Sequence, residues 1–249
     1  MSIVLFCVIM TIAVVLTMVG LGGGLIFSPL FVLLGLPKTT AASASLFLNL
    51  LAAGSAAYTY SRKKMVDFSL SVPLIIASSL AAPLGSYLNA RLPLQPFVLI
   101  MAVILALAGV RMLWSPHQDA NRPPVSPAVK IGGGLGIGVI IGFLGGLLGI
   151  GGGVFVVPLL IYLLHTPARI AAASSTFIVC FSSLTGFLGY ASLEGVDWGF
   201  ILPAAAASLL GGQIGARLMS TKLQGRHVRI LFSLVLFTFC AKLLQQFFT

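Results

Sequence analysis

The sequence predicts an all-α polytopic membrane protein built from two inverted-topology repeats. Of its 249 residues, 59% are hydrophobic and 7% are charged, whereas about a quarter of the residues in a soluble domain are charged. About 20 consecutive apolar residues span a bilayer as a helix, and several charge-free stretches of this length occur. They exclude a soluble enzyme, a disulfide-rich secreted scaffold and a disordered chain. Their length also favours helices over a barrel, whose strands alternate over about ten residues.

The chain contains an internal repeat. Gly-Leu-Gly-Gly-Gly at 20–24 is followed by Gly-Ile-Gly-Gly-Gly at 149–153, and the residues after each copy match in order. Further pairs at this nearly constant spacing are Pro29 and Pro158, Pro37 and Pro167, Ser45 and Ser175, Tyr60 and Tyr190, Asp67 and Asp197, and Pro73 and Pro203. The sequence therefore predicts two repeats, 1–114 and 130–249, joined by a polar linker at 115–129.

Each repeat begins with a charge-free run, 1–37 or 131–168, that is too long for one straight span. Because consecutive glycines weaken a helix, we expect a helix, a glycine break and a short helix of about 12 residues, which rises about 18 Å and does not cross a bilayer alone. The pattern leaves open whether the short helices are re-entrant. The predicted elements are a broken helix at 3–36 with spans at 39–60, 67–90 and 95–114, then a broken helix at 131–164 with spans at 168–192, 198–219 and 227–248.

The distribution of Lys and Arg favours inverted repeats. If each broken helix crosses once, the 14 basic residues divide 7 to 7 between the two sides, and if it doubles back they divide 11 to 3. The positive-inside rule favours the second arrangement, with both termini outside. The net charge of +10 then reflects topology, and we expect no nucleic-acid partner. The eleven residues on one side are Arg62, Lys63, Lys64, Arg111, Arg122, Lys130, Arg169, Arg217, Lys222, Arg226 and Arg229.

The glycine breaks are the predicted substrate site. A helix that starts at a glycine presents unpaired N–H groups and the positive end of its dipole, which favour an anion. A break at membrane depth must line a cavity or the protein interior, and broken helices of inverted repeats face each other near the midplane of transporters. The next span in each repeat adds hydroxyl and amide groups. The predicted substrate-binding residues are Gly22, Gly23, Gly24, Ser43, Ser45, Asn49, Gly151, Gly152, Gly153, Ser174, Ser175 and Thr176.

Structural roles compete with this interpretation. Glycines in membrane helices commonly allow close packing, and Gly134, Gly138, Gly142 and Gly146 are expected to do so because of their four-residue spacing. Serine and threonine also bond to their own helix or bridge two helices. The hydroxyl clusters therefore have a structural and a functional interpretation.

The positions of the acidic residues and the cysteines argue against cation transport, a metal site and catalysis. Asp67, Glu194 and Asp197 lie at the edges of predicted spans and Asp119 lies in the linker, whereas proton and cation carriers usually bury a carboxylate. We therefore expect an anionic substrate. The three cysteines form no metal-ligand spacing, and no acid–base or nucleophile set can be assembled. We expect no catalytic residue, no metal and no cofactor.

The doubled GxGGG motif, the proline five residues after each copy and the following Ala/Ser-rich helix resemble the TauE/SafE sulfite exporter family of membrane permeases. The resemblance covers nearly the whole chain. It implies a multi-pass protein of the bacterial inner membrane that exports sulfite, organosulfonates or related small sulfur oxyanions. The matching glycines are Gly20, Gly22, Gly23, Gly24, Gly149, Gly151, Gly152 and Gly153.

We therefore predict a secondary transporter that holds a small anion between the short helices and works by alternating access between the repeats. Membrane lipid surrounds the protein, and the sequence makes no prediction of the oligomeric state. Two alternatives stay open. One is a channel or carrier for another small anion or a neutral metabolite, and the other is a membrane scaffold that transports nothing.

Overall fold

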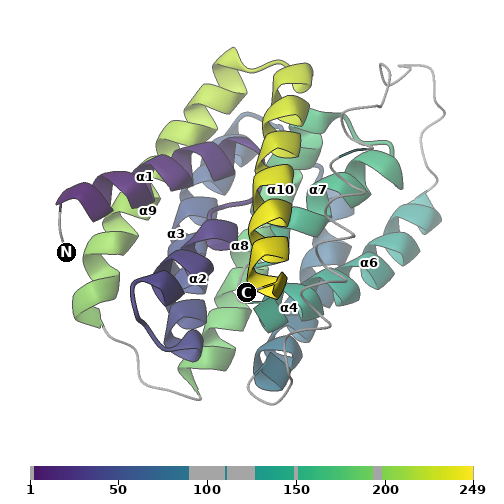
Figure 1. Cartoon of the computed structure of the whole chain (residues 1–249). Helices are drawn as coiled ribbons and strands as arrows, with labels where there is room; N and C mark the ends of the chain where they lie inside the picture. Colours follow the sequence, from purple (N-terminus) through teal and green to yellow (C-terminus); the bar gives the residue numbers. More distant parts are fainter. Residues whose placement is uncertain (1–2, 90–109, 111–126, 149–150, 193–197, 249) are drawn as a thin grey trace.

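A computed structural model describes residues 3–89, 110, 127–148, 151–192 and 198–248. These residues form helices and the turns between them, with no strand in the described ranges (Figure 1). The helices are α1 (Ile3–Met18), α2 (Gly24–Leu33), α3 (Lys38–Arg62), α4 (Phe68–Asn89), α6 (Pro127–Leu148), α7 (Gly153–Tyr162), α8 (Ala168–Ala191), α9 (Trp198–Lys222) and α10 (Gly225–Phe248). The predicted span at 95–114 and most of the linker at 115–129 lie outside the described residues.

The short helices α2 and α7 have 10 residues each, fewer than the expected 12. The backbone leaves helical geometry just after them, where Gly35 has a φ of 87° and His165 a φ of 52°. Left-handed residues end a helix because they cannot continue its hydrogen bonding. Helix α6 begins at Pro127, inside the expected linker, because proline is preorganised for the first helical position.

Four of the described helices are long and apolar enough to cross a bilayer, at Thr39–Arg62, Phe68–Leu88, Ala168–Ala191 and Ile201–Lys222. Their outward faces are also apolar. On α4 the exposed side chains recur every four residues, at Val72, Ile76, Leu80 and Leu84. Such a row forms one continuous face of a helix, and in a bilayer it is covered by lipid chains.

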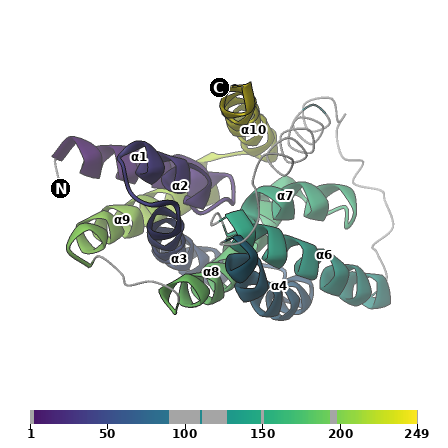
Figure 2. The same cartoon turned by 60° about the horizontal axis from the view of Figure 1, so that its bottom comes forward.

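Helices α3 and α8 cross antiparallel in the middle of the protein. The residue numbers of the contacts rise along α3 as they fall along α8. The contacting pairs are Leu46 and Gly186, Asn49 and Ser183, and Gly54 and Cys180. The two most buried of the four described candidate spans therefore form a central pair, and the other described helices pack around them (Figure 2).

Each of the two crossing helices belongs to a group of helices packed side by side. In the first group α9 runs parallel to α1, because Gly211 contacts Met10 and Gly215 contacts Val14. It also runs parallel to α3, whose Leu48 carbonyl accepts a hydrogen bond from Ser208 on α9. In the second group α4 packs against α6 and α8. Figure 2 shows the first group on one side of the molecule and α4, α6 and α7 on the other.

The contact between α4 and α6 is built from small residues. Gly138, Gly142 and Gly146 of α6 lie directly against the α4 backbone, at Leu74, Ser78 and Ala82. Because lipid chains are as apolar as side chains, helices in a membrane associate through close packing of this kind. These glycines therefore have the packing role that their spacing predicts.

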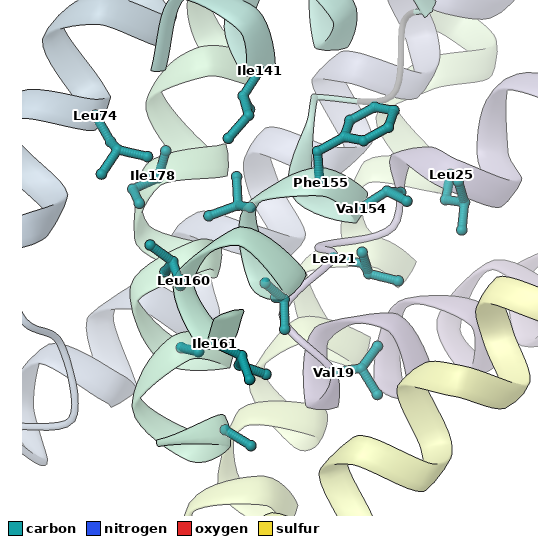
Figure 3. Packing of buried hydrophobic residues seen from close by; sticks show 14 of the residues in the cluster. Val19, Leu21, Leu25, Leu74, Ile141, Val154, Phe155, Leu160, Ile161 and Ile178 are labelled. Carbon is teal, nitrogen blue, oxygen red and sulfur yellow. The ribbon is translucent and has the colours of Figure 1, made fainter. Parts of the chain in front are cut away.

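A buried apolar cluster surrounds α7. Figure 3 shows Val154, Phe155 and Leu160 of α7 between Leu74 of α4 and Ile141 of α6 on one side and Val19, Leu21 and Leu25 on the other. Val19 and Leu25 flank the motif at 20–24, and Leu21 lies within it. The described residues of both glycine motifs, 20–24 and 151–153, are therefore buried inside the protein.

The α4–α6 contact predicts a position-dependent cost of a single methyl group. A Cβ on Gly142 overlaps the Ser78 backbone, whereas a Cβ on Gly136 meets nothing within 4 Å. We expect Gly142→Ala to lower the free energy of unfolding by about 2 kcal/mol or more through overpacking. Gly136→Ala should leave it unchanged or raise it, since alanine favours a helix. Unfolding by dodecyl sulfate in mixed micelles measures both, and equal effects of the two changes would contradict the packing.

Candidate functional site

The two glycine motifs meet inside the protein. We call residues 20–24 the first glycine segment and residues 149–153, of which 151–153 are described, the second. Gly153 lies against the Cα of Leu21 and the carbonyl oxygen of Gly20, and a Cβ on Gly153 would stand 3.1 and 3.2 Å from these atoms. The described residues of both segments are buried. The starts of α2 and α7 are therefore neighbours although 129 residues separate them in sequence.

Asn49 of α3 lies between the two segments. Its Oδ1 accepts a hydrogen bond of 3.1 Å from the N–H of Gly24, the first residue of α2. Its Nδ2 donates a hydrogen bond of 2.8 Å to Ser183 Oγ on α8. A Cβ on Gly22 would overlap Oδ1 and a Cβ on Gly151 would overlap Nδ2. The Asn49 amide, which is 0% exposed, therefore contacts both glycine segments, and it requires glycine at these two positions.

Hydroxyl groups satisfy the carbonyl groups of both segments. Ser45 donates to the Gly24 carbonyl at 3.0 Å and Ser175 to the Gly20 carbonyl at 2.7 Å. Thr17 donates to the Gly22 carbonyl at 3.1 Å and Ser182 to the Gly151 carbonyl at 2.9 Å. Each of these four carbonyl oxygens therefore accepts a hydrogen bond from a hydroxyl group of the protein. Several peptide N–H groups of the segments also have protein acceptors: Gly20 donates to the Thr17 carbonyl, Leu21 to the Leu16 carbonyl, Gly151 to the Gly145 carbonyl and Gly24 to Asn49 Oδ1.

The structure brings together only some of the predicted residues. Gly22, Gly24, Ser45, Asn49, Gly151, Gly153 and Ser175 share the contacts just described. Gly23 lies against the Phe27 ring, and Gly152 lies against Ile141 as the left-handed N-cap of α7.

The remaining predicted hydroxyls have other surroundings. Ser174 Oγ accepts a hydrogen bond of 3.0 Å from the Asp67 N–H at the start of α4. Thr176 Oγ1 donates to the Ala172 carbonyl of its own helix at 2.9 Å. Ser43 is buried, and its Oγ has no hydrogen-bond partner in the described part of the chain.

Two tyrosines hold the helices that lead into the glycine segments. Tyr60 donates to the Thr17 carbonyl in the last turn of α1, at 3.1 Å, and Tyr190 donates to the Gly146 carbonyl in the last turn of α6, at 3.2 Å. The last carbonyls of a helix have no partner within it, so each phenol satisfies one of them. The tyrosines were recognisable as a repeated pair, but their partners were not.

The two halves differ at the centre of the site. The counterpart of Asn49 in the repeat is Val179, which packs a methyl group against Gly153. The counterparts of Ser182 and Ser183 are Ala52 and Ala53. A valine cannot accept a hydrogen bond, so α2 has a side-chain amide at its start where α7 has a methyl group.

Basic residues gather at one end of the central helices. Lys63, just after α3, donates to Ser220 Oγ at 2.8 Å, and Arg169 at the start of α8 donates to the Ser220 carbonyl at 2.8 Å. The Arg169 guanidinium therefore lies at the last turn of α9, where a cation is favourable. These contacts put the end of α3, the start of α8 and the end of α9 at the same end of the protein.

Comparison with known proteins identifies the family. Residues 5–243 match the family model described as sulfite exporter TauE/SafE. The chain belongs to the TauE/SafE family. Similar proteins are the probable membrane transporter protein YunE of Bacillus subtilis (strain 168), 27% identical over 92% of both chains, and a probable membrane transporter protein of Xylella fastidiosa (strain 9a5c), 26% identical over 86% of this chain and 83% of the relative. No solved structure matches.

Another TauE/SafE relative, the probable membrane transporter protein MJ0441 of Methanocaldococcus jannaschii, is 24% identical over 87% of this chain and 85% of its own length. The relatives therefore align with most of the chain, and the residues matched by the family model include both glycine segments. Together with the four helices able to span a bilayer, this makes the chain a multi-pass member of a family of probable membrane transporters.

Two glycines separate the effect of backbone conformation from that of the Asn49 contact. Gly22 and Gly35 have similar φ values, 80° and 87°, but only Gly22 lies against another group. We expect Gly35→Ala to cost about 1 kcal/mol of unfolding free energy, because left-handed geometry disfavours a Cβ. Gly22→Ala should cost about 2 kcal/mol more, because its methyl group displaces the Asn49 amide. Unfolding titrations in micelles measure the difference, and equal costs would contradict the described contact.

Proposed function

We propose that this protein is a secondary transporter that exports small sulfur oxyanions such as sulfite or organosulfonates. The observation that carries the proposal is the meeting of the two glycine segments around Asn49 in the buried centre of the protein. Two helix starts from different halves of the chain are neighbours there. The family to which the chain belongs supports the sulfur substrate, and the site supports the negative charge.

Backbone geometry favours an anion at this place. The first N–H groups of α2 and α7 have no partner within their own helices, and each helix start carries a partial positive charge. Ser45 and Ser175 donate to carbonyl groups of the first segment, so the oxygen atoms that would repel an anion are already bonded. Asp67, the acidic residue that the structure describes, lies at the start of α4 and accepts from Ser69 and Leu70.

The helix directions support inverted repeats. In a chain whose halves correspond at a spacing of 130 residues, Leu50 of α3 corresponds to Cys180 of α8, and the Cys180 sulfur lies 4.0 Å from the Leu50 carbonyl. Equivalent residues that meet at an antiparallel crossing place a two-fold axis through that point, perpendicular to the helices. For helices that cross a membrane such an axis lies in the membrane plane, as in inverted-topology transporters.

The packing also suggests how the halves move. The first group contains α1 and α3 of the first repeat with α9 of the second, and the second group contains α6 and α8 with α4. The groups meet at the α3–α8 crossing and at the glycine segments. Rocking of one group against the other would open this place to each side in turn, which is alternating access. The basic end of the central helices would face the cytoplasm, with both termini outside the inner membrane.

Transport by the reconstituted protein tests the proposed function. Proteoliposomes loaded with sulfite should release it in a saturable manner that taurine or another sulfonate inhibits. Gly152→Val should reduce the rate at least about tenfold, because Gly152 has left-handed geometry at the start of α7. Gly136→Val, at an open surface position, is the matched control and should keep the rate.

The outcomes of this assay separate the candidate functions. Release no faster than from protein-free liposomes, for every anion, would contradict transport and favour a scaffold. Equal rates for sulfite and for a neutral solute such as glycerol would contradict an anion site and favour a channel or carrier of neutral metabolites.

Labelling of single cysteines tests the inverted topology. In a variant without the native cysteines, Lys64→Cys and Thr221→Cys should react with a membrane-impermeant maleimide from the cytoplasmic side. Gly35→Cys, in the turn after α2 at the opposite end of α3, should react from the outside. Labelling of Gly35→Cys and Lys64→Cys from the same side would contradict the arrangement.

A further inference from the structure

Asn49 is hydrogen-bonded to the Gly24 N–H, one of the donors at the start of α2 that the proposed function assigns to the substrate. Its Oδ1 accepts the N–H of Gly24 at 3.1 Å. An amide oxygen and an oxyanion oxygen are both acceptors for a backbone N–H, and the anion is the stronger one. An anion bound at the start of α2 therefore competes with Asn49 for this group.

The fold does not require an amide at this place. Val179, the counterpart of Asn49 on α8, packs against Gly153, and α7 nevertheless begins after the same glycine motif. The helices α2 and α7 have the same length. The Asn49 cap on α2 is therefore present in one repeat and absent from the other. Formation of a helix after the glycine motif does not explain why it is there.

The same amide joins the two groups of helices. Asn49 belongs to α3 in the first group, and its Nδ2 donates to Ser183 of α8 in the second group at 2.8 Å. Rotation of the side chain away from Gly24 also changes this bond, because one planar amide makes both contacts. The contents of the site and the contact between the groups are therefore coupled through one side chain.

We propose that Asn49 is a latch, an internal group that occupies the start of α2 in the empty transporter and is displaced by the substrate anion. Displacement releases the hydrogen bond to Ser183 and with it one contact between the two groups. This inference rests on the proposed function for the identity of the anion. It makes Asn49 a positioning residue that weakens substrate binding, in contrast to a ligand that strengthens it.

The size of the effect follows from competition. If Asn49 must leave Gly24 before the anion binds, the apparent affinity for the anion falls by the equilibrium constant that favours the Asn49–Gly24 hydrogen bond. A single buried hydrogen bond of this kind corresponds to a factor of about three to ten. Removal of the latch should therefore lower the KM for sulfite by about threefold to tenfold.

The chain itself suggests the variant. Asn49→Val combined with Ser183→Ala gives α3 and α8 the residues that their counterparts, Val179 and Ala53, already have. It leaves no hydroxyl without its partner, and a valine is seen to fit against a glycine at the equivalent place. The control is Ser208→Ala, which removes a buried hydrogen bond of 2.7 Å to the Leu48 carbonyl on the outer side of α3.

The experiment compares wild-type protein, the double variant and the control in liposomes, by initial rates of sulfite release over a range of concentrations. The double variant should have a KM about threefold to tenfold lower, and the control should stay within twofold of wild type. Loss of a merely structural contact does not lower KM. The sulfite concentration that gives half-maximal thermal stabilisation in detergent is measured for the same proteins as a readout independent of flux.

Each outcome decides between the latch and the proposed function. An unchanged or higher KM and half-saturating concentration in the double variant overturns the latch and leaves transport intact. A lower half-saturating concentration without flux in any protein supports the latch and contradicts transport. Absence of sulfite binding to all three proteins contradicts both.

Discussion

Satisfaction of backbone polar groups at membrane depth is the constraint on which the structure depends. A helix meets this requirement within itself, but a chain that leaves helical geometry inside a bilayer exposes peptide groups that lipid cannot bind. In the described part of the chain, the backbone leaves helical geometry in the buried interior at the first and second glycine segments. Thr17, Ser45, Ser175 and Ser182 then supply the donors for their carbonyl groups, and Asn49 accepts from Gly24.

This constraint also accounts for the arrangement of the helices. The donors for the first segment come from both halves, since Ser45 is on α3 and Ser175 on α8. The antiparallel crossing of these helices brings both serines within reach of the first segment, Ser45 at Gly24 and Ser175 at Gly20. The close crossing in turn needs small residues such as Gly54 and Gly186 at the contact, and glycines on α6 and α9 let the outer helices approach as well. The hydrogen bonds to the first glycine segment therefore depend on close helix contacts, and these contacts depend on small residues.

Much of this architecture was predictable from the sequence because it depends on local patterns. Charge-free stretches predicted the apolar helices, and the spacing of the repeat singled out the two glycine segments with Ser45 and Ser175. Ser182 and Ser183 were missed because their counterparts are Ala52 and Ala53, so a search for repeated polar residues passes over them. Ser174 and Thr176 adjoin Ser175, but successive residues of a helix point about 100° apart, and one sequence alone does not show which of three neighbours faces the site.

A structure determined with sulfite bound tests the central claim most directly. The account predicts the anion at the start of α2, within hydrogen-bond distance of the Gly24 N–H and between the two glycine segments, with the Asn49 amide turned away from Gly24. An anion bound elsewhere, with the Gly24–Asn49 hydrogen bond still in place, would contradict it.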